Sequence, residues 1–355
     1  MITLIALTLT ISIFSLLSLR KVAIVYDLVD KPTHRKVHEG NIPFIGGQAL
    51  FVTLVSMGLW QPNLIPHSFE YLMVSGILVA VGTVDDKLNI RASTRLVILL
   101  LLSLWLIYVK GISLTQLGNL FGTGDIDVGA GSVVLTTAAI IGCICAFNMV
   151  DGIDGLLGGL ASVTFAGLGF LFWYSGDVNL AYFCSLFVLA MLPYIFFNLD
   201  LIPKRSFKVF MGDSGSFLIG FTIVWLLIHS SQVLPDGSTT SLVLQPVTAL
   251  WLIALPLMDM AMVMIRRMKK RRSPFKPDRL HLHHLCVRLG MSARQTLAFI
   301  VALSVLLACL GIWAQLQGVP ESLMLATFIA LFLLYVVIIS YIWRISTFIR
   351  QWRQA

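Results

Sequence analysis

Long apolar stretches recur along almost the whole chain. A run of about 20 apolar residues crosses a bilayer as a helix, because a helix rises about 1.5 Å per residue and the hydrocarbon core is about 30 Å thick. Eleven such runs centre near residues 10, 52, 77, 102, 140, 165, 189, 221, 254, 306 and 332. The third and fifth runs are short or interrupted by glycine. The pattern predicts an all-α polytopic membrane protein with about eleven transmembrane helices.

Basic residues fall on alternate connections between these runs. Of the 25 Lys and Arg residues, all but Lys110 lie on one set of connections. Lys and Arg collect on the cytoplasmic side of membrane proteins, so the asymmetry predicts a periplasmic N-terminus and a cytoplasmic C-terminus. No basic residue precedes the first run, whereas Arg20 and Lys21 follow it. We therefore expect this run to be retained as an anchor rather than removed as a signal peptide.

The composition excludes several classes of function. Of the 355 residues, 58% are hydrophobic and 12% are charged, whereas soluble domains contain about 25% charged residues. The net charge of +8 follows from the basic loops and does not indicate a nucleic-acid partner. The five cysteines form no CxxC pair, which indicates neither a disulfide framework nor a zinc site. We expect residues 1–355 to form a single integral-membrane domain with its chemistry at one membrane face.

Aspartates on the predicted cytoplasmic connections are the first candidates for that chemistry. They occur in VDDK, FNMVDGIDGLLGG and FMGDSGS, and are Asp85, Asp86, Asp151, Asp154 and Asp213. Any one of them alone is typical of a helix N-cap. Carboxylates in three loops on one membrane face instead favour a shared site, because such groups are costly at membrane depth. Mg²⁺ prefers hard oxygen ligands together with water and phosphate, so we expect a magnesium diphosphate site, with Mn²⁺ as the alternative ion.

A basic loop carries three histidines. In PDRLHLHHL, Asp278 and Arg279 precede His281, His283 and His284. A helix through this segment would place His281 and His284 on one face and His283 on another, and the spacing does not match HExxH. Both features argue against zinc. Contacts from Arg279 and the histidines to phosphate and sugar are favoured, and a purely structural role of the loop is the alternative.

Together these motifs resemble the polyprenyl-phosphate N-acetylhexosamine-1-phosphate transferase family, over about residues 30–288. The matching segments are the Asp-Asp pair at 85–86, NxxDGxDGL at 148–156, GD(S/T/A)GS at 212–216 and the HIHH loop at 281–284, with Leu for Ile. The HxHH loop after PDR is typical of the bacterial branch that uses undecaprenyl phosphate, outside peptidoglycan synthesis. One position departs from the pattern, since some bacterial relatives have DDxxD where this chain has Asn89.

The resemblance implies transfer of N-acetylglucosamine 1-phosphate from UDP-GlcNAc to undecaprenyl phosphate in the bacterial inner membrane. This reaction starts a surface polysaccharide such as O-antigen or enterobacterial common antigen. It implies that Asn148 and Asp213 contact Mg²⁺ and that Asp85, Asp86 and Asp154 are catalytic. The implied substrate contacts are Asp30, Arg95, Asp151, Asp278, Arg279, His281, His283 and His284. Inhibition by tunicamycin is expected as well.

Several alternatives stay open at this point. The donor is UDP-GlcNAc or another UDP-N-acetylhexosamine, the attack is direct or passes through an aspartyl phosphate, and a homodimer is compatible with the sequence. A secondary transporter is the rival from another class, because intramembrane aspartates and glycine-broken spans also mark ion paths. The nearly uncharged periplasmic connections argue against it. An inactive scaffold is disfavoured by intact Asp85, Asp86, Asn148 and Asp213.

Overall fold

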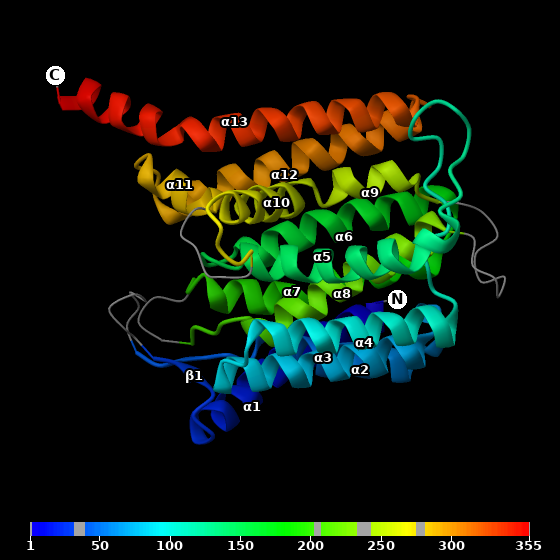
Figure 1. Ribbon diagram of the computed structural model, residues 1–355. Coiled ribbons are helices and arrows are strands. Elements are labelled where there is room, and N and C mark those ends of the chain that lie inside the picture. Colours follow the sequence, from blue (N-terminus) through cyan, green and yellow to red (C-terminus); the bar gives the residue numbers. More distant parts are fainter. Residues whose placement is uncertain (1, 32–39, 202–206, 233–242, 275–280, 355) are drawn as a thin grey trace.

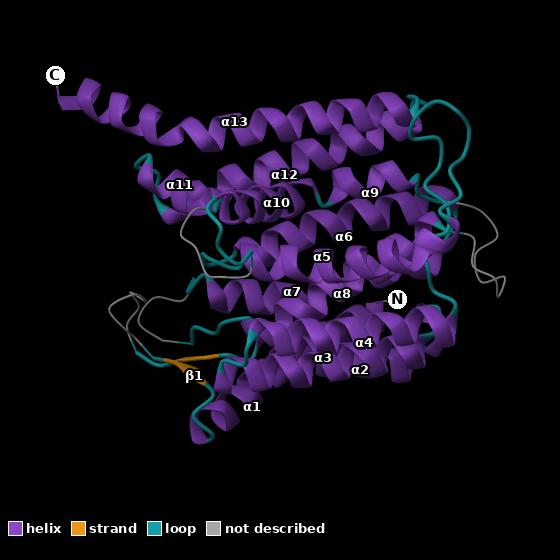
Figure 2. Cartoon of the chain, in the orientation of Figure 1, coloured by secondary structure: helices purple, strands orange, loops and turns teal. Residues whose placement is uncertain are grey.

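Helices make up nearly all of the regular structure and run side by side through the molecule (Figures 1 and 2). The computed structural model describes residues 2–31, 40–201, 207–232, 243–274 and 281–354. Its helices are α1 (Ile2–Val25), α2 (Gly46–Trp60), α3 (Ser68–Leu88), α4 (Ala92–Lys110), α5 (Ser132–Val150), α6 (Leu156–Ser175), α7 (Val178–Asn198), α8 (Gly212–Ser231), α9 (Pro246–Leu252), α10 (Ala254–Lys269), α11 (Leu282–Arg288), α12 (Ala293–Leu316) and α13 (Glu321–Gln354). Two 3-10 turns, Pro62–Leu64 and Gly129–Gly131, complete them.

The lengths and compositions of these helices identify a multi-pass membrane protein. Within the described residues, nine helices are long and apolar enough to cross a membrane, and there are ten if the bent pair α9 and α10 is counted as one span. The remaining predicted span is α2, an apolar helix of 15 residues. This is shorter than the about 20 residues that a span usually needs. The helical membrane fold is thus confirmed, while the count of eleven and the direction of insertion stay predictions.

The predicted span near residue 254 is broken in the structure. The axes of α9 and α10 differ by 81°, with the break at Ile253. Pro256 in the first turn of α10 has no N–H to donate to the carbonyl of Leu252, so the helical hydrogen bond across the break is missing. The freed Leu252 carbonyl accepts a hydrogen bond from Thr164 Oγ1 on α6 at 3.1 Å. A neighbouring helix therefore satisfies the polar group that the break leaves in an apolar region.

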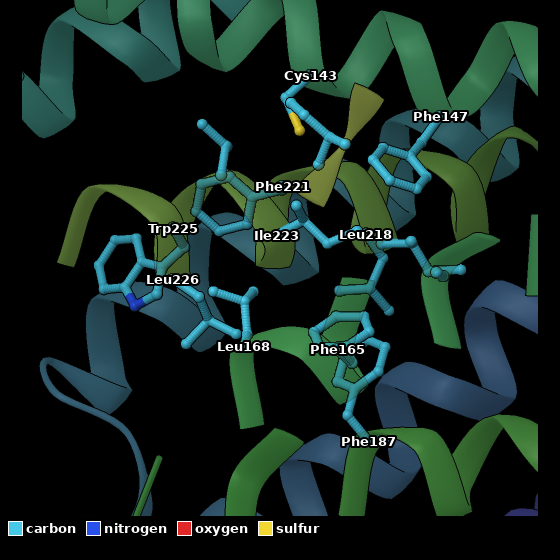
Figure 3. Packing of buried hydrophobic residues seen from close by; sticks show 14 of the residues in the cluster. Cys143, Phe147, Phe165, Leu168, Phe187, Leu218, Phe221, Ile223, Trp225 and Leu226 are labelled. Carbon is cyan, nitrogen blue, oxygen red and sulfur yellow. The ribbon is translucent and has the colours of Figure 1, made fainter. Parts of the chain in front are cut away.

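Helix α8 is the centre of the bundle, and its whole apolar stretch is buried. Figure 3 shows Phe221, Trp225 and Leu226 of this helix packed among side chains of α5, α6 and α7. Phe165 of α6 and Phe187 of α7 stack there with ring centroids 4.1 Å apart. Burial of such large apolar side chains fixes α8 in place. The polar residues at its first turn are consequently held at one end of the bundle.

Glycines let other helices approach the first turn of α8 closely. A Cβ atom on Gly47 of α2 would lie 2.6 Å from the carbonyl carbon of Ser214, and one on Gly82 of α3 would lie 2.7 Å from that of Asp213. Both distances are too short for a side chain. Small residues at helix contacts permit this kind of close backbone packing in membranes. The packing brings the last turn of α3, with its two aspartates, against the start of α8.

A two-stranded ribbon is the exception to the all-α prediction. Strand β1 (Val29–Asp30) pairs antiparallel with β2 (Ile42–Pro43), and Asp30 faces Ile42 in the register. The segment that leads into α8 extends this pairing, since Phe210 N–H donates to the Pro43 carbonyl at 2.9 Å. The ribbon therefore anchors Asp30 and the turn before Asp213 at the same end of the bundle.

Candidate active site

The described residues that the sequence singled out lie at one end of the bundle, where β1 and α11 are labelled in Figure 1. Two adjoining cavities open there. The acidic cavity, of about 790 Å³, is lined by Asp30, Asp85, Asp86, Asp151, Asp154 and Asp213, among others. The basic cavity, of about 300 Å³, is lined by Arg95, Arg267, His281, His283 and His284, among others. Asn148, Asp151 and Gly152 border both cavities, so opposite charges face each other across this border.

Arg95 joins the Asp-Asp segment to the start of α8. Its Nη1 lies 2.6 Å from Asp85 Oδ2 and 3.3 Å from Asp213 Oδ2. Asp85 is buried, and an unpaired buried carboxylate would be costly, so Arg95 balances its charge. Asp85 of α3, Arg95 of α4 and Asp213 of α8 thus form one cluster, with the basic side chain between the two acidic ones. The Asp30 carboxylate lies in the same cavity, on β1.

Asp86 binds the N-terminus of α8. Its carboxylate accepts hydrogen bonds from the backbone N–H groups of Asp213 at 2.8 Å and Ser214 at 3.4 Å. Negative charge at a helix N-terminus is favourable because the first N–H groups have no partner within the helix. This close contact requires glycine at position 212. Its φ is +73°, and a Cβ atom there would collide with Asp86 Oδ2. A capping role is therefore present at Asp86, although it serves a helix distant in the sequence.

Asn148 completes the cluster from α5. Its Nδ2 donates to Asp213 Oδ1 at 2.7 Å and to Ser216 Oγ at 2.8 Å. Both amide hydrogens are therefore used, and no hydrogen bond to Asn148 Oδ1 is formed within the described part of the chain. The amide oxygen is left as an acceptor at the border of the two cavities.

The loop from α5 to α6 contributes Asp151 and Asp154. Burial raises the pKa of Asp151 to about 7, and the negative charges of Asp213 and Asp154 add to the effect. The Asp151 carboxyl nevertheless stays accessible from the cavities that it lines. Asp154 Oδ2 pairs with Lys208 Nζ at 2.5 Å. The two aspartates of one loop thus differ, since one has a cationic partner and the other is surrounded by like charge.

The histidine segment, residues 281–284, does not form the continuous helix considered from the sequence. Helix α11 begins only at Leu282, and His281 precedes it in an extended conformation with ψ of 155°. The rings of His281 and His283 are therefore parallel within 6°, with centroids 5.8 Å apart. All three histidines line the basic cavity. The expectation that His283 points away from the other two was wrong, because it assumed a helix through His281.

Burial, together with the neighbouring His284 and His281, lowers the pKa of His283 to about 3. This side chain is consequently neutral at physiological pH. Gly152 packs directly against its ring, so that any Cβ atom at 152 would collide with it. The aspartate loop and the histidine segment are therefore in direct contact.

Comparisons with known proteins identify the family of this chain. Residues 68–231, from α3 to α8, match the family described as Glycosyl transferase family 4. Over 349 residues the chain is 44% identical to the undecaprenyl-phosphate alpha-N-acetylglucosaminyl 1-phosphate transferase of Salmonella typhi, covering 98% of this chain and 93% of that protein. The Yersinia pestis protein of this name is 44% identical over 94% of this chain and 90% of its own length. The Haemophilus influenzae protein of this name is 40% identical over 96% of this chain and 94% of its own length.

The chain belongs to the polyprenyl-phosphate N-acetylhexosamine-1-phosphate transferase family. It is a multi-pass membrane enzyme and a phosphoglycosyl transferase. Membership in a family of enzymes favours the transferase over the secondary transporter, the alternative raised by the sequence.

Two predicted substrate contacts of this phosphoglycosyl transferase, Asp278 and Arg279, lie outside the described residues. The geometry brings the other predicted residues to the two cavities, and their individual roles stay predictions.

The structure also adds polar residues that the motifs did not mark. Arg267, buried near the end of α10, lines the basic cavity, and Lys208 pairs with Asp154. Asn198, at the end of α7, accepts from Gly155 N–H at 2.6 Å and donates to the Val209 carbonyl at 2.9 Å. It thereby ties the aspartate loop to the segment before α8. In the sequence, Asn198 and Arg267 are marked only as polar residues at the ends of apolar runs.

Proposed function

We propose that this phosphoglycosyl transferase moves N-acetylglucosamine 1-phosphate from UDP-GlcNAc to undecaprenyl phosphate, releasing UMP. The names of its relatives state the sugar and the lipid. The observation that carries the proposal is the border between the acidic and basic cavities, where Asn148 and Asp151 lie. A reaction between two anionic substrates needs a cation site and positive side chains in one place. The carboxylates that line the acidic cavity and the basic side chains that line the other support the proposal.

The donor set fits a magnesium ion. Asp213 and Asn148 would hold it, with Asp85 close by on the other side of Arg95. The amide hydrogens of Asn148 bond to Asp213 and Ser216, so its oxygen is the atom that would bind the ion. Mg²⁺ is usually bound by one or two carboxylates, water and substrate phosphates, so a larger cluster of protein ligands is unnecessary. When bound, the ion would neutralise charge on the diphosphate.

The chemistry proposed is a direct displacement. A phosphate oxygen of the lipid forms a bond to the β-phosphorus of UDP-GlcNAc while the bond to the bridging oxygen breaks, and UMP leaves with the electron pair. A phosphate monoester has a second pKa of about 6, so the nucleophile is already ionised at neutral pH. Arg95, held in place by Asp85, orients the phosphates, and Asp86 keeps the α8 N-terminus in position through its backbone hydrogen bonds. The side chains chiefly position the groups and balance their charge.

We propose that the reaction takes place on the cytoplasmic side of a bacterial inner membrane and begins a surface polysaccharide such as O-antigen. The distribution of Lys and Arg supports this orientation. Single cysteines in a protein without its five natural cysteines test it: one at Ser273, beside Pro274, whose carbonyl binds the cavity residue Arg267, and one at Asp125, in the connection from α4 to α5. In sealed right-side-out vesicles a membrane-impermeant thiol reagent should label only the second, and labelling of only the first would reverse the orientation.

The activity is tested with purified full-length protein in lipid nanodiscs. Undecaprenyl phosphate, Mg²⁺ and radiolabelled UDP-GlcNAc should give a labelled lipid and an equal amount of UMP. Both products should be lost with tunicamycin or EDTA, and Mn²⁺ is tested as a replacement ion. UDP-GalNAc in a parallel reaction tests the alternative donor. No labelled lipid from any UDP-N-acetylhexosamine would overturn the proposal.

A further inference from the structure

Asp259 is a buried carboxylate in the middle of α10, with 4% of its surface exposed. Three groups from two other segments donate to it. Its Oδ2 lies 2.7 Å from His281 Nδ1, and its Oδ1 accepts from Leu282 N–H at 2.9 Å and from Tyr335 OH at 2.8 Å. A carboxylate is retained at such depth only when its hydrogen bonds are satisfied. The three bonds together fix the start of α11 against α10 and α13.

The contact with His281 determines which ring nitrogen faces the cavity. Asp259 has no hydrogen to donate when ionised, so Nδ1 of His281 carries the proton in this bond. Nε2, on the opposite side of the ring, is the nitrogen left for a ligand in the basic cavity that His281 lines. The ring of His281 lies parallel to that of His283, which packs against Gly152 of the aspartate loop. His281 therefore lies beside the side chain that packs on the border between the cavities.

We infer that Asp259 is a positioning residue for the transfer reaction, which acts by holding His281 with Nδ1–H bonded to its carboxylate, so that the protonated ring donates Nε2–H to a substrate phosphate oxygen. The inference rests on the proposed function. Carboxylates that bind the remote nitrogen of a functional histidine fix its tautomer and the direction of its ring. Asp259 itself lines neither cavity in the described part of the chain, so its effect on turnover passes through His281, which does.

A double-mutant cycle tests this route in the nanodisc assay. Asp259→Asn should reduce turnover by about 10- to 100-fold, the range for loss of a carboxylate that orients a histidine. His281→Asn keeps an amide N–H where Nδ1 lies, so Asp259 stays paired, while Nε2 is removed. Adding Asp259→Asn to His281→Asn should cost less than about twofold more, because residues that act through one contact are not additive. If the loss of turnover in the double variant equals the product of the losses in the two single variants, the inference is overturned.

The outcomes separate the two proposals. An inactive wild-type protein would overturn the proposed function and the inference with it. An active wild-type protein with undiminished turnover in Asp259→Asn would overturn the inference alone. Tyr335→Phe is the matched control, because it removes one hydrogen bond from Asp259 but leaves the pair with His281. A smaller loss than in Asp259→Asn is expected from it, and an equal loss would indicate a merely structural role for Asp259.

A measurement on the wild-type protein does not depend on the folding of Asp259→Asn. The chain contains seven histidines, and the ¹⁵N signals that disappear in His281→Asn identify those of residue 281. Their chemical shifts should show a protonated Nδ1. A neutral ring with its proton on Nε2 would overturn the inference, because Nδ1 would then have no hydrogen to share with Asp259.

Discussion

Asn148 Nδ2 and Asp213 Oδ1 are 2.7 Å apart although 65 residues separate them in the chain. This hydrogen bond joins the end of α5 to the start of α8. A second bond from the same amide to Ser216 fixes its orientation, so the two functional segments form one unit. The relationship explains how polar side chains far apart in the sequence come to lie at one border between the cavities.

Asp213→Asn should abolish most of the activity while the protein stays folded. The replacement amide has nearly the same shape and can still pair with Asn148, but it removes the negative charge that we assign to the cation site. We expect turnover to fall by about 10²- to 10³-fold, as for loss of one electrostatic stabiliser in an active site. Turnover at saturating Mg²⁺ and thermal unfolding are the measurements.

The matched control is Asp177→Asn, at the N-cap of α7. Asp177 Oδ1 accepts from Leu180 N–H at 3.1 Å, and Asn is as good an N-cap as Asp. Helix α7 starts at the end of the bundle remote from both cavities, so turnover should be unchanged. Equal activity of both variants would remove Asp213 from the reaction.

Arg95→Gln should change turnover and magnesium affinity in opposite directions. Arg95 lies between Asp85 and Asp213, so its loss leaves two carboxylates without their shared cation. Turnover should fall about 10- to 100-fold with the lost charge stabilisation. The Mg²⁺ concentration for half-maximal activity should fall too, because Arg95 no longer competes for these carboxylates. A titration of activity with Mg²⁺ measures both quantities.

Arg95→Lys distinguishes charge from geometry. Lysine restores the positive charge but not the planar fork of donors, so partial recovery of turnover is expected. A higher Mg²⁺ requirement in Arg95→Gln would contradict the assigned position of the cation.

Much of the candidate site was predictable because the membrane limits where polar loops can lie. Once alternate connections share a side, Asp85, Asn148 and Asp213 must face the same compartment, and their order along the chain matches the family motifs. The helical fold followed from the length of the apolar runs alone. What placed these residues within hydrogen-bond distance was close packing at glycines such as Gly82, which periodicity does not reveal.

Residues within apolar runs were the harder part of the prediction. Asp259 lies in a methionine-rich run and gave no sign of its partners, which come from 22 and 76 residues further along the chain. The stacking of His281 on His283 depends on α11 beginning at Leu282, and helix boundaries are the least certain feature of a sequence pattern. Tertiary contacts determine both the partners of Asp259 and the stacking of the histidines, and the pattern of a single sequence does not predict such contacts.

Gly152→Ala should reduce activity through a steric effect on His283. The Cβ atom would overlap the imidazole ring, so the ring or the aspartate loop must move. Because positioning errors of about 1 Å can cost about 10²-fold in rate, we expect a loss of that order. Gly142→Ala in α5 is the control, since a Cβ atom there meets nothing within 4 Å. If both variants retain full turnover, contact between the aspartate loop and His283 is dispensable.

Asp151 should make the stability of the ion-free protein depend on pH. Its pKa of about 7 in the folded state exceeds the ordinary aspartate value of 3.8, first because of burial and then because of Asp213 and Asp154. Between these two values the unfolded chain has lost the proton that the folded protein keeps, so this carboxyl favours unfolding more strongly as the pH rises. Its contribution is absent below about pH 4 and reaches its full size above about pH 7.

Thermal unfolding in EDTA compares the wild type with Asp151→Asn, which has no titrating group at this position. The Tm of the variant should exceed that of the wild type by a margin that widens from pH 5 to pH 8. Saturating Mg²⁺ should reduce the margin, because a cation bound beside Asp151 stabilises its ionised form. A margin that is constant with pH, or that narrows as pH rises, would show that Asp151 is ionised in the folded protein well below neutral pH.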